Sequence, residues 1–144
     1  MRLFTIGFTQ KSAEDFFTRL KVGGVKRLVD VRLNNRSQLA GFAKKDDLPF
    51  FLREINRIDY VRLPLLAPTQ DMLDEYKKRK GAWVDYERDF LTLMSTRRIE
   101  EHVDRSVLMD SCLLCSEDLP AKCHRRLVAE YLSNRWSDIR IRHL

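Results

Sequence analysis

The sequence predicts an α/β fold: a single Rossmann-like three-layer domain with a mostly parallel sheet of about five strands. Two observations support this class. Apolar runs of strand length alternate with segments of helical periodicity along the chain. The run at residues 107–114 is almost continuously apolar, as in strands buried on both faces of a parallel sheet. Because 144 residues is a usual size for one domain, we expect one domain over residues 1–144.

The first strand and helix have clear boundaries in the sequence. Residues 2–6 are predicted to form a short strand that ends at Gly7. Ser12 is then a candidate helix N-cap, with Asp15 three positions later in a variant of the capping box. Apolar residues follow at helical spacing until the glycine pair at 23–24 ends the helix.

The next segment contains two further strands around one helix. Residues 27–31 form the second predicted strand, and the polar stretch at 32–45 is long enough to be functional. A helix begins at Asp47, with Pro49 in its first turn. Residues 60–63 are the third predicted strand.

The second half of the chain repeats this alternation. Aromatic and aliphatic residues between 72 and 94 indicate two helices separated by Gly81. The strand at 107–114 follows, a last helix comes after Pro120, and residues 139–141 form an edge strand. The alternation predicts parallel strands joined by crossover helices.

This order brings distant polar residues together. The carboxyl ends of parallel strands lie along one edge of the sheet, where α/β folds bind ligands. Gly7, Asp30 with Arg32, and Cys115 with Glu117 each end or follow a predicted strand. We therefore expect them to meet at one pocket, to which the last helix presents its free N–H groups, a natural anion site.

Five residues are candidates for catalysis. Glu117 and His124 are predicted to handle protons as a carboxylate–imidazole pair. Cys115 or Cys123 is a nucleophile or a wall of the pocket. Cys123, in the first turn of a helix and near basic residues, is expected to have a lowered pKa. Asp30 joins them because it ends an otherwise apolar strand.

The candidate substrate-binding residues are those able to approach or hold an anion or a base. Guanidinium groups bind anions through two hydrogen bonds, phenylalanine stacks on a base, and glycine allows close approach. The set consists of Gly7, Arg32, Arg36, Gly41, Phe42 and Arg125.

The cysteines also raise the question of zinc. Cys112 and Cys115 have the C-x-x-C spacing, and Cys123 with His124 would complete four ligands. However, strand residues three apart point to opposite faces, so Cys112 is expected in the core with a raised pKa. Adjacent Cys123 and His124 are also an awkward chelate. The sequence therefore predicts no metal, and it identifies no cofactor.

Several motifs, in their order along the chain, resemble the DUF488 family. Phe8 and Thr9 depart from its usual His-Ser pair, so no acid/base role is expected at position 8. The resemblance implies an α/β fold and a cluster of polar positions, and the family's conserved cysteines imply enzymes. The motifs are residues 5–7, 28–32, 36–37, 41–42, 60–64, 113–117 and 123–125.

Composition indicates the kind of partner and compartment. Lys and Arg total 27 against 21 acidic residues, giving a net charge of +6, which favours an anionic small molecule or a nucleic acid. No apolar run approaches the ~20 residues of a membrane span, and the amino terminus lacks a secretory pattern. Three cysteines, an odd number, fit a reducing cytosol. We expect a cytoplasmic protein without a membrane partner.

Three classes of function remain open. The favoured one is an enzyme that acts on an anionic nucleotide or nucleic-acid-derived substrate at the carboxyl edge of the sheet. The second is a thiol-dependent enzyme of sulfur transfer or redox chemistry. The third is a non-catalytic nucleic-acid-binding module. Selective alkylation of one cysteine favours the second class, and a steep loss of affinity with salt favours the third.

Overall fold

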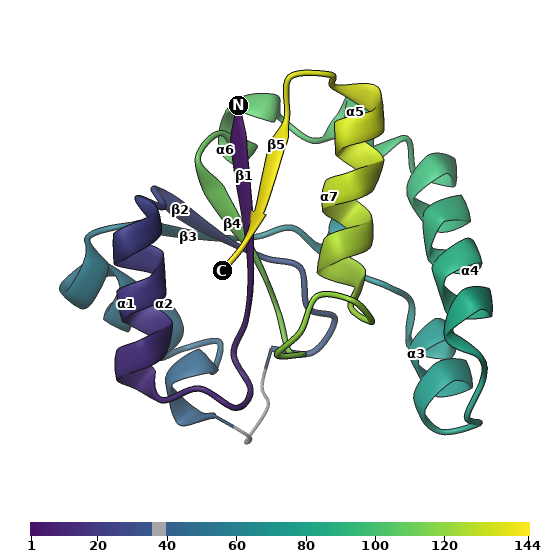
Figure 1. Cartoon of the computed structure of the whole chain (residues 1–144). Helices are drawn as coiled ribbons and strands as arrows, with labels where there is room; N and C mark the ends of the chain where they lie inside the picture. Colours follow the sequence, from purple (N-terminus) through teal and green to yellow (C-terminus); the bar gives the residue numbers. More distant parts are fainter. Residues whose placement is uncertain (36–39) are drawn as a thin grey trace.

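The computed structural model describes residues 1–35 and 40–144. A parallel sheet of five strands, in the order β3-β2-β4-β1-β5, forms its centre (Figure 1). This architecture confirms the predicted α/β Rossmann-like class. The strands are β1 (Arg2–Gly7), β2 (Arg27–Asp30), β3 (Asp59–Arg62), β4 (Ser111–Cys115) and β5 (Arg140–His143).

Helices lie on both sides of the sheet, which completes three layers. Helices α1 and α2 cover one face, whereas α3, α4 and α7 lie on the other (Figure 1). None of the helices that the structure describes is long and apolar enough to span a bilayer. The helices are α1 (Ala13–Gly23), α2 (Leu48–Phe51), α3 (Gln70–Lys77), α4 (Trp83–Thr96), α5 (Ile99–His102), α6 (Arg105–Leu108) and α7 (His124–Arg135), with η1 (Gly41–Ala43), η2 (Leu52–Asn56) and η3 (Pro64–Leu66).

The ends of α1 follow the predicted signals. The Ser12 side chain accepts a hydrogen bond from the Asp15 backbone N–H at 3.0 Å. At the other end Gly24 adopts a left-handed conformation with φ of 73°, which suits glycine as a helix terminator. These local signals fix where the chain leaves and rejoins the sheet.

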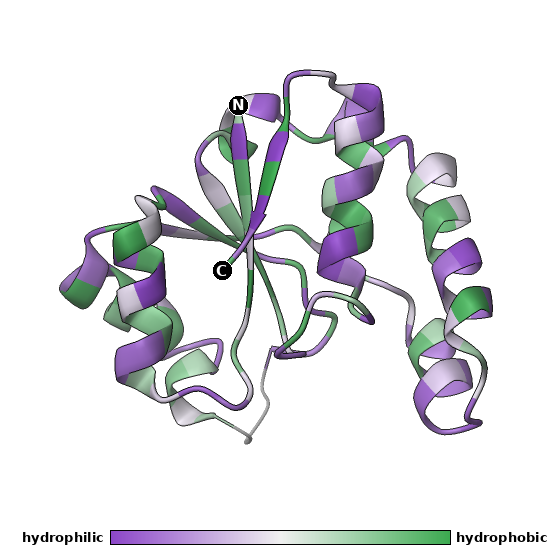
Figure 2. Ribbon diagram, viewed as in Figure 1, coloured by the Kyte–Doolittle hydropathy of each residue, from purple (hydrophilic) through white to green (hydrophobic). Residues whose placement is uncertain are grey.

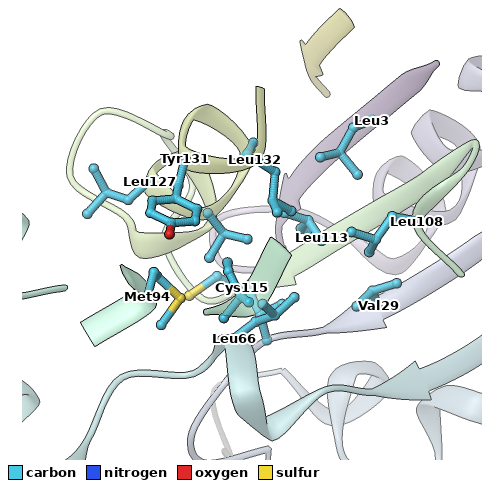
Figure 3. Packing of buried hydrophobic residues seen from close by; sticks show 14 of the residues in the cluster. Leu3, Val29, Leu66, Met94, Leu108, Leu113, Cys115, Leu127, Tyr131 and Leu132 are labelled. Atoms are coloured by element: carbon cyan, nitrogen blue, oxygen red, sulfur yellow. The ribbon is translucent and has the colours of Figure 1, made fainter. Parts of the chain in front are cut away.

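Two apolar clusters fill the space between the layers. Alternate residues of β4 point to opposite faces, so Cys112 and Leu114 pack toward α1 whereas Leu113 and Cys115 pack toward α4 and α7. Apolar and polar residues alternate along the helices, as expected for amphipathic helices (Figure 2). Figure 3 shows Cys115 among the residues of the α4–α7 cluster. The Cys115 side chain is therefore part of the apolar core.

The predicted strand at residues 107–114 was wrong at its start. The Asp104 carboxylate caps a short helix, α6, by accepting from the Ser106 backbone N–H at 2.9 Å. Asp110 then takes a positive φ of 53°, and β4 begins at the next residue. Apolarity alone did not distinguish this helical turn from a strand.

The predicted convergence of strand ends is confirmed. Gly7 lies opposite Cys115 in the register between β1 and β4, and Asp30 lies opposite Leu114 in the register between β2 and β4. Because all these strands run parallel, their carboxyl ends share one edge of the sheet. The functional candidates of three separate segments thus meet there.

Candidate active site

A pocket of about 160 Å³ opens at the carboxyl edge of the sheet. It lies between the end of β4, the start of α7, helices α3 and α4, and the segment after β2. Its sulfur-bearing, charged and aromatic lining residues are Arg32, Tyr76, Lys77, Trp83, Tyr86, Cys115, Glu117, Lys122, Cys123 and His124. All the predicted catalytic residues except Asp30 line this pocket, and so does Arg32.

A thiol and an imidazole form the centre of the pocket. Cys115 ends β4 and His124 opens α7, and the Cys115 Sγ lies 3.4 Å from the His124 Nδ1. The His124 Nε2 lies 2.7 Å from the Val31 carbonyl oxygen. Because a carbonyl can only accept, Nε2 carries the proton and Nδ1 is the unprotonated nitrogen. The Cys115 Sγ is also 3.8 Å from Nε2, so the sulfur lies over the imidazole ring, nearer to Nδ1.

The surroundings lower the pKa values of both His124 and Cys115. Burial lowers the pKa of His124 from its ordinary value of 6.5, so the imidazole is a neutral base at neutral pH. Burial alone would raise the pKa of Cys115. Hydrogen bonds from the Cys123 thiol and the Ser116 backbone N–H, together with the Arg125 charge, outweigh burial and lower the pKa of Cys115.

The predicted low-pKa thiol was therefore the wrong one. Cys123 is only 3% exposed, and its burial, with the neighbouring Cys115, raises the pKa of Cys123 well above its usual range. Position at a helix start does not compensate for the loss of water around a thiolate. Cys112 lies on the opposite face of the sheet and, as predicted, burial raises its pKa.

Glu117 has a different partner from the one predicted. Its carboxylate lies 2.9 Å from the Lys77 Nζ, and its side chain is 47% exposed. The His124 ring instead bonds to Val31 and faces Cys115. The predicted carboxylate–imidazole pair does not form, and Glu117 lies at the mouth of the pocket beside a cation.

Asp30 lies behind the pocket and holds Arg32. Its two carboxylate oxygens accept from the Arg32 Nε at 2.9 Å and Nη2 at 2.8 Å. The Tyr60 hydroxyl donates to the same carboxylate at 2.6 Å, and burial together with this bond raises the pKa of Tyr60 to about 12. Arg32 also donates to the Ala43 carbonyl and stacks over the Phe8 ring. Asp30 is therefore a positioning residue for Arg32.

Arg125 and Gly7 support the loop after β4 instead of lining the pocket. The Arg125 guanidinium donates to the Glu117 carbonyl at 2.5 Å, the Asp118 carbonyl at 3.1 Å and the Thr5 hydroxyl at 3.3 Å. A Cβ on Gly7 would lie 1.7 Å from the Glu117 carbonyl oxygen. Both residues hold the chain that follows Cys115 against β1.

The remaining binding candidates lie elsewhere. Phe42 is in η1 and packs against Phe16 and Phe17, with ring centroids 5.1 and 5.8 Å away. Gly41 is exposed beside it, and neither residue lines the pocket. Arg36 falls outside the described residues, so its role stays a prediction.

Sequence reasoning missed the aromatic wall of the pocket. Trp83 and Tyr86 stack with ring centroids 5.1 Å apart, and the Tyr76 ring lies 5.5 Å from that of Trp83. Their helical spacing indicated only a core pattern. The sequence feature that could have indicated this wall is the occurrence of three aromatic residues within eleven positions, in a basic segment that also supplies Lys77.

One group of side chains in the described part of the chain is suited to a metal ion. Donor atoms of Cys115, Cys123 and His124 all lie within 4.8 Å of one another. Cys123 and His124 are adjacent at the start of α7, and both place a donor atom near Cys115. Cys112 takes no part, since it points to the opposite face.

The buried imidazole has a consequence for acid stability. The pKa of His124 is lowered from 6.5, so the unfolded chain takes up a proton more readily and stability should fall as the pH drops below about 6.5. Urea unfolding in EDTA should show that the free energy of unfolding falls less between about pH 7.5 and pH 5.5 for His124→Gln than for wild type. Some pH dependence of the stability should remain in the variant, because burial also lowers the pKa of His143. Exposed His102→Gln is the control, and an unchanged loss in His124→Gln would contradict the expectation.

Comparison with known proteins finds a matching family but no described activity. The family model described as "Domain of unknown function DUF488" matches residues 12–132. No curated protein and no solved structure matches the chain. The geometry of the pocket therefore has to supply the functional argument.

Proposed function

Because the chain belongs to the DUF488 family, whose description assigns no activity, we propose its function from the pocket: a cysteine-dependent enzyme acting on an anionic nucleotide or nucleic-acid-derived substrate. The observation that carries the proposal is the 3.4 Å approach of the Cys115 Sγ to the His124 Nδ1. A nucleophile, a base and a group that orients the base are the parts of an activated thiol. Here the Val31 carbonyl orients the base.

The proposed chemistry is nucleophilic substitution through a thiol. The Cys115 proton passes to the His124 Nδ1, and the Sγ forms a bond to an electrophilic carbon of the substrate. The leaving group departs with its bonding electron pair and takes the proton from the imidazolium. Water then displaces the thiolate from that carbon, which releases the product and restores the thiol. No change of oxidation state is required.

The pocket walls support the choice of substrate. Trp83 and Tyr76 present aromatic rings, on which a base can stack. Lys77 and Lys122 line the same pocket with positive charge. Arg32 borders the pocket too, but its guanidinium is buried and its charge is balanced by Asp30. A flat ring with an attached anion satisfies both features, as in a nucleotide.

A sulfur-transfer or redox enzyme is the second candidate, favoured by one observation. The Cys123 thiol lies beside Cys115, with donor atoms within 4.8 Å. In this candidate a sulfane-sulfur donor transfers its outer sulfur to the Cys115 thiolate and leaves as a thiol, and attack of Cys123 on the resulting persulfide releases sulfide and leaves a Cys115–Cys123 disulfide. Product analysis separates the two candidates, since only sulfur transfer leaves a persulfide or this disulfide.

Alkylation tests the nucleophile. Native protein in EDTA near neutral pH should react with iodoacetamide first at Cys115, because its pKa is lowered whereas those of Cys112 and Cys123 are raised. Peptide mapping identifies the labelled cysteine, and His124→Asn should slow the reaction. Cys112→Ala is the control and should react like wild type. Equal labelling of the three cysteines would remove the proposal.

Ligand binding tests the substrate class. The chain has two tryptophans, so a Trp136→Phe background leaves Trp83 as the fluorescent reporter of the pocket. Nucleoside monophosphates should quench it, and the Lys77→Ala/Lys122→Ala variant should bind about tenfold more weakly. Lys26→Ala, at the opposite edge of the sheet, should bind like its parent. Binding of oligonucleotides alone, with a steep salt dependence, would favour the non-catalytic module.

A further inference from the structure

We infer that Cys115, Cys123 and His124 form a three-ligand site for a soft divalent cation of the Zn²⁺ class, with a fourth coordination position facing the pocket. The site exists whatever the enzyme's substrate. Its regulatory consequence, that the cation silences the Cys115 nucleophile, rests on the proposed function. The inference depends on where three donor atoms lie and on what surrounds them.

The spacing of the donors fits tetrahedral zinc. Zinc–sulfur and zinc–nitrogen bonds of about 2.3 and 2.0 Å place the two donor atoms about 3.5 Å apart at a tetrahedral angle. The Cys115 Sγ and His124 Nδ1 are 3.4 Å apart. No donor pair in the trio with Cys123 exceeds 4.8 Å.

The outer contacts already orient the ligands. The His124 Nε2–H donates to the Val31 carbonyl at 2.7 Å, which leaves Nδ1 as the unprotonated nitrogen able to bind a cation. Metal-bound histidines commonly make such a bond through their second nitrogen. The Ser116 backbone N–H donates to the Cys115 sulfur and helps to stabilise its thiolate form.

The three donor residues are buried, and they border the pocket. Cys115, Cys123 and His124 are 6%, 3% and 6% exposed, and they come from the end of β4 and the start of α7. All three also line the pocket, so a cation held by them would face it. Three protein ligands with one open position are typical of exchangeable or catalytic zinc, whereas structural zinc has four protein ligands.

Charge balance supports a dication. Two thiolates and Zn²⁺ sum to zero, so binding removes the cost of placing two negative sulfurs side by side. Each thiol releases its proton to solvent on binding, and no atom is oxidised or reduced. The Cys115 electron pair then forms a bond to the metal and is unavailable for attack on carbon.

Cobalt spectroscopy tests the site without an activity assay. The full chain is reduced, stripped with EDTA, desalted and titrated with Co²⁺, whose thiolate complexes absorb by charge transfer in the near ultraviolet. Wild type and Cys112→Ala should each bind one Co²⁺ with this band, and Zn²⁺ should displace it. Cys123→Ser, which keeps the side chain's size at the start of α7, should weaken binding by more than about 100-fold, since even outer-shell changes cost up to that factor. Circular dichroism establishes that the variant is folded.

The outcomes separate this inference from the proposed function. Zn²⁺ should protect Cys115 from iodoacetamide, and EDTA should restore the reaction. Absence of the charge-transfer band, or equal cobalt affinity in wild type and Cys123→Ser, would overturn the metal site even if Cys115 remains the selectively alkylated thiol in EDTA. A cobalt band without selective alkylation would instead support the metal site and remove the thiol enzyme.

Discussion

Replacing Asp30 with alanine is expected to lower the free energy of unfolding by about 3–5 kcal/mol. Asp30 is fully buried, and it accepts three hydrogen bonds from Arg32, whose side chain is 2% exposed. Removing the carboxylate leaves a buried guanidinium without its counter-charge. The Tyr60 hydroxyl loses its acceptor at the same time.

Equilibrium unfolding in urea measures this loss, and two further variants identify its cause. Asp30→Leu/Arg32→Met removes both charges and should recover much of the stability, because apolar residues of similar size often replace a buried ion pair without loss. Asp59→Ala removes a carboxylate that is 76% exposed and should change stability by less than about 1 kcal/mol. If the double variant is as unstable as Asp30→Ala, the unpaired charge is not the cause.

Replacing Gly7 with alanine is expected to destabilise the protein by about 3 kcal/mol, at the upper end for an overpacked site. The new Cβ would lie 1.7 Å from the Glu117 carbonyl oxygen and 2.6 Å from its carbonyl carbon. Both are backbone atoms, so no side-chain rotation relieves the contact. The loop after β4 must move, which disturbs the bonds from Thr9 to the Ser116 carbonyl.

The same variant should alter the pocket as well as stability. Displacement of Ser116 removes a hydrogen bond from the Cys115 sulfur, so alkylation of Cys115 in the folded variant should become slower. Gly41→Ala is the matched control, because a Cβ at that position would have no neighbour within 4 Å, and its effect should stay within about 0.5 kcal/mol. A Gly7→Ala protein as stable as wild type would show that the loop tolerates the displacement.

The fold and the location of the pocket could be predicted because they depend on patterns local to the sequence. Strand and helix signals alternate, and parallel strands must end at one edge. That rule alone predicts that Gly7, Asp30 and Cys115 come together. A second rule, that successive strand residues point to opposite faces, predicts that Cys112 lies on the face opposite Cys115.

The roles of individual side chains depended on contacts that the sequence does not contain. Arg125 has the chemistry of an anion ligand, yet loop carbonyls at Glu117 and Asp118 occupy its guanidinium. Cys123 has the position of an activated thiol, yet burial raises its pKa. In each case packing of the β4–α7 loop determines the role, and that packing involves residues far apart in the chain.

The acceptor that holds the His124 ring is the main-chain carbonyl of Val31, and this has a consequence for how the site can be dissected and how it can change. An alanine scan leaves every carbonyl in place, so it would report Val31 as a packing residue and nothing more. For the same reason, any aliphatic side chain that preserves the path of the backbone at position 31 preserves the imidazole's tautomer. Chemical editing of that one amide to a thioamide weakens the acceptor and keeps the Arg32 N–H that donates to Asp30, so it would probe this contact directly.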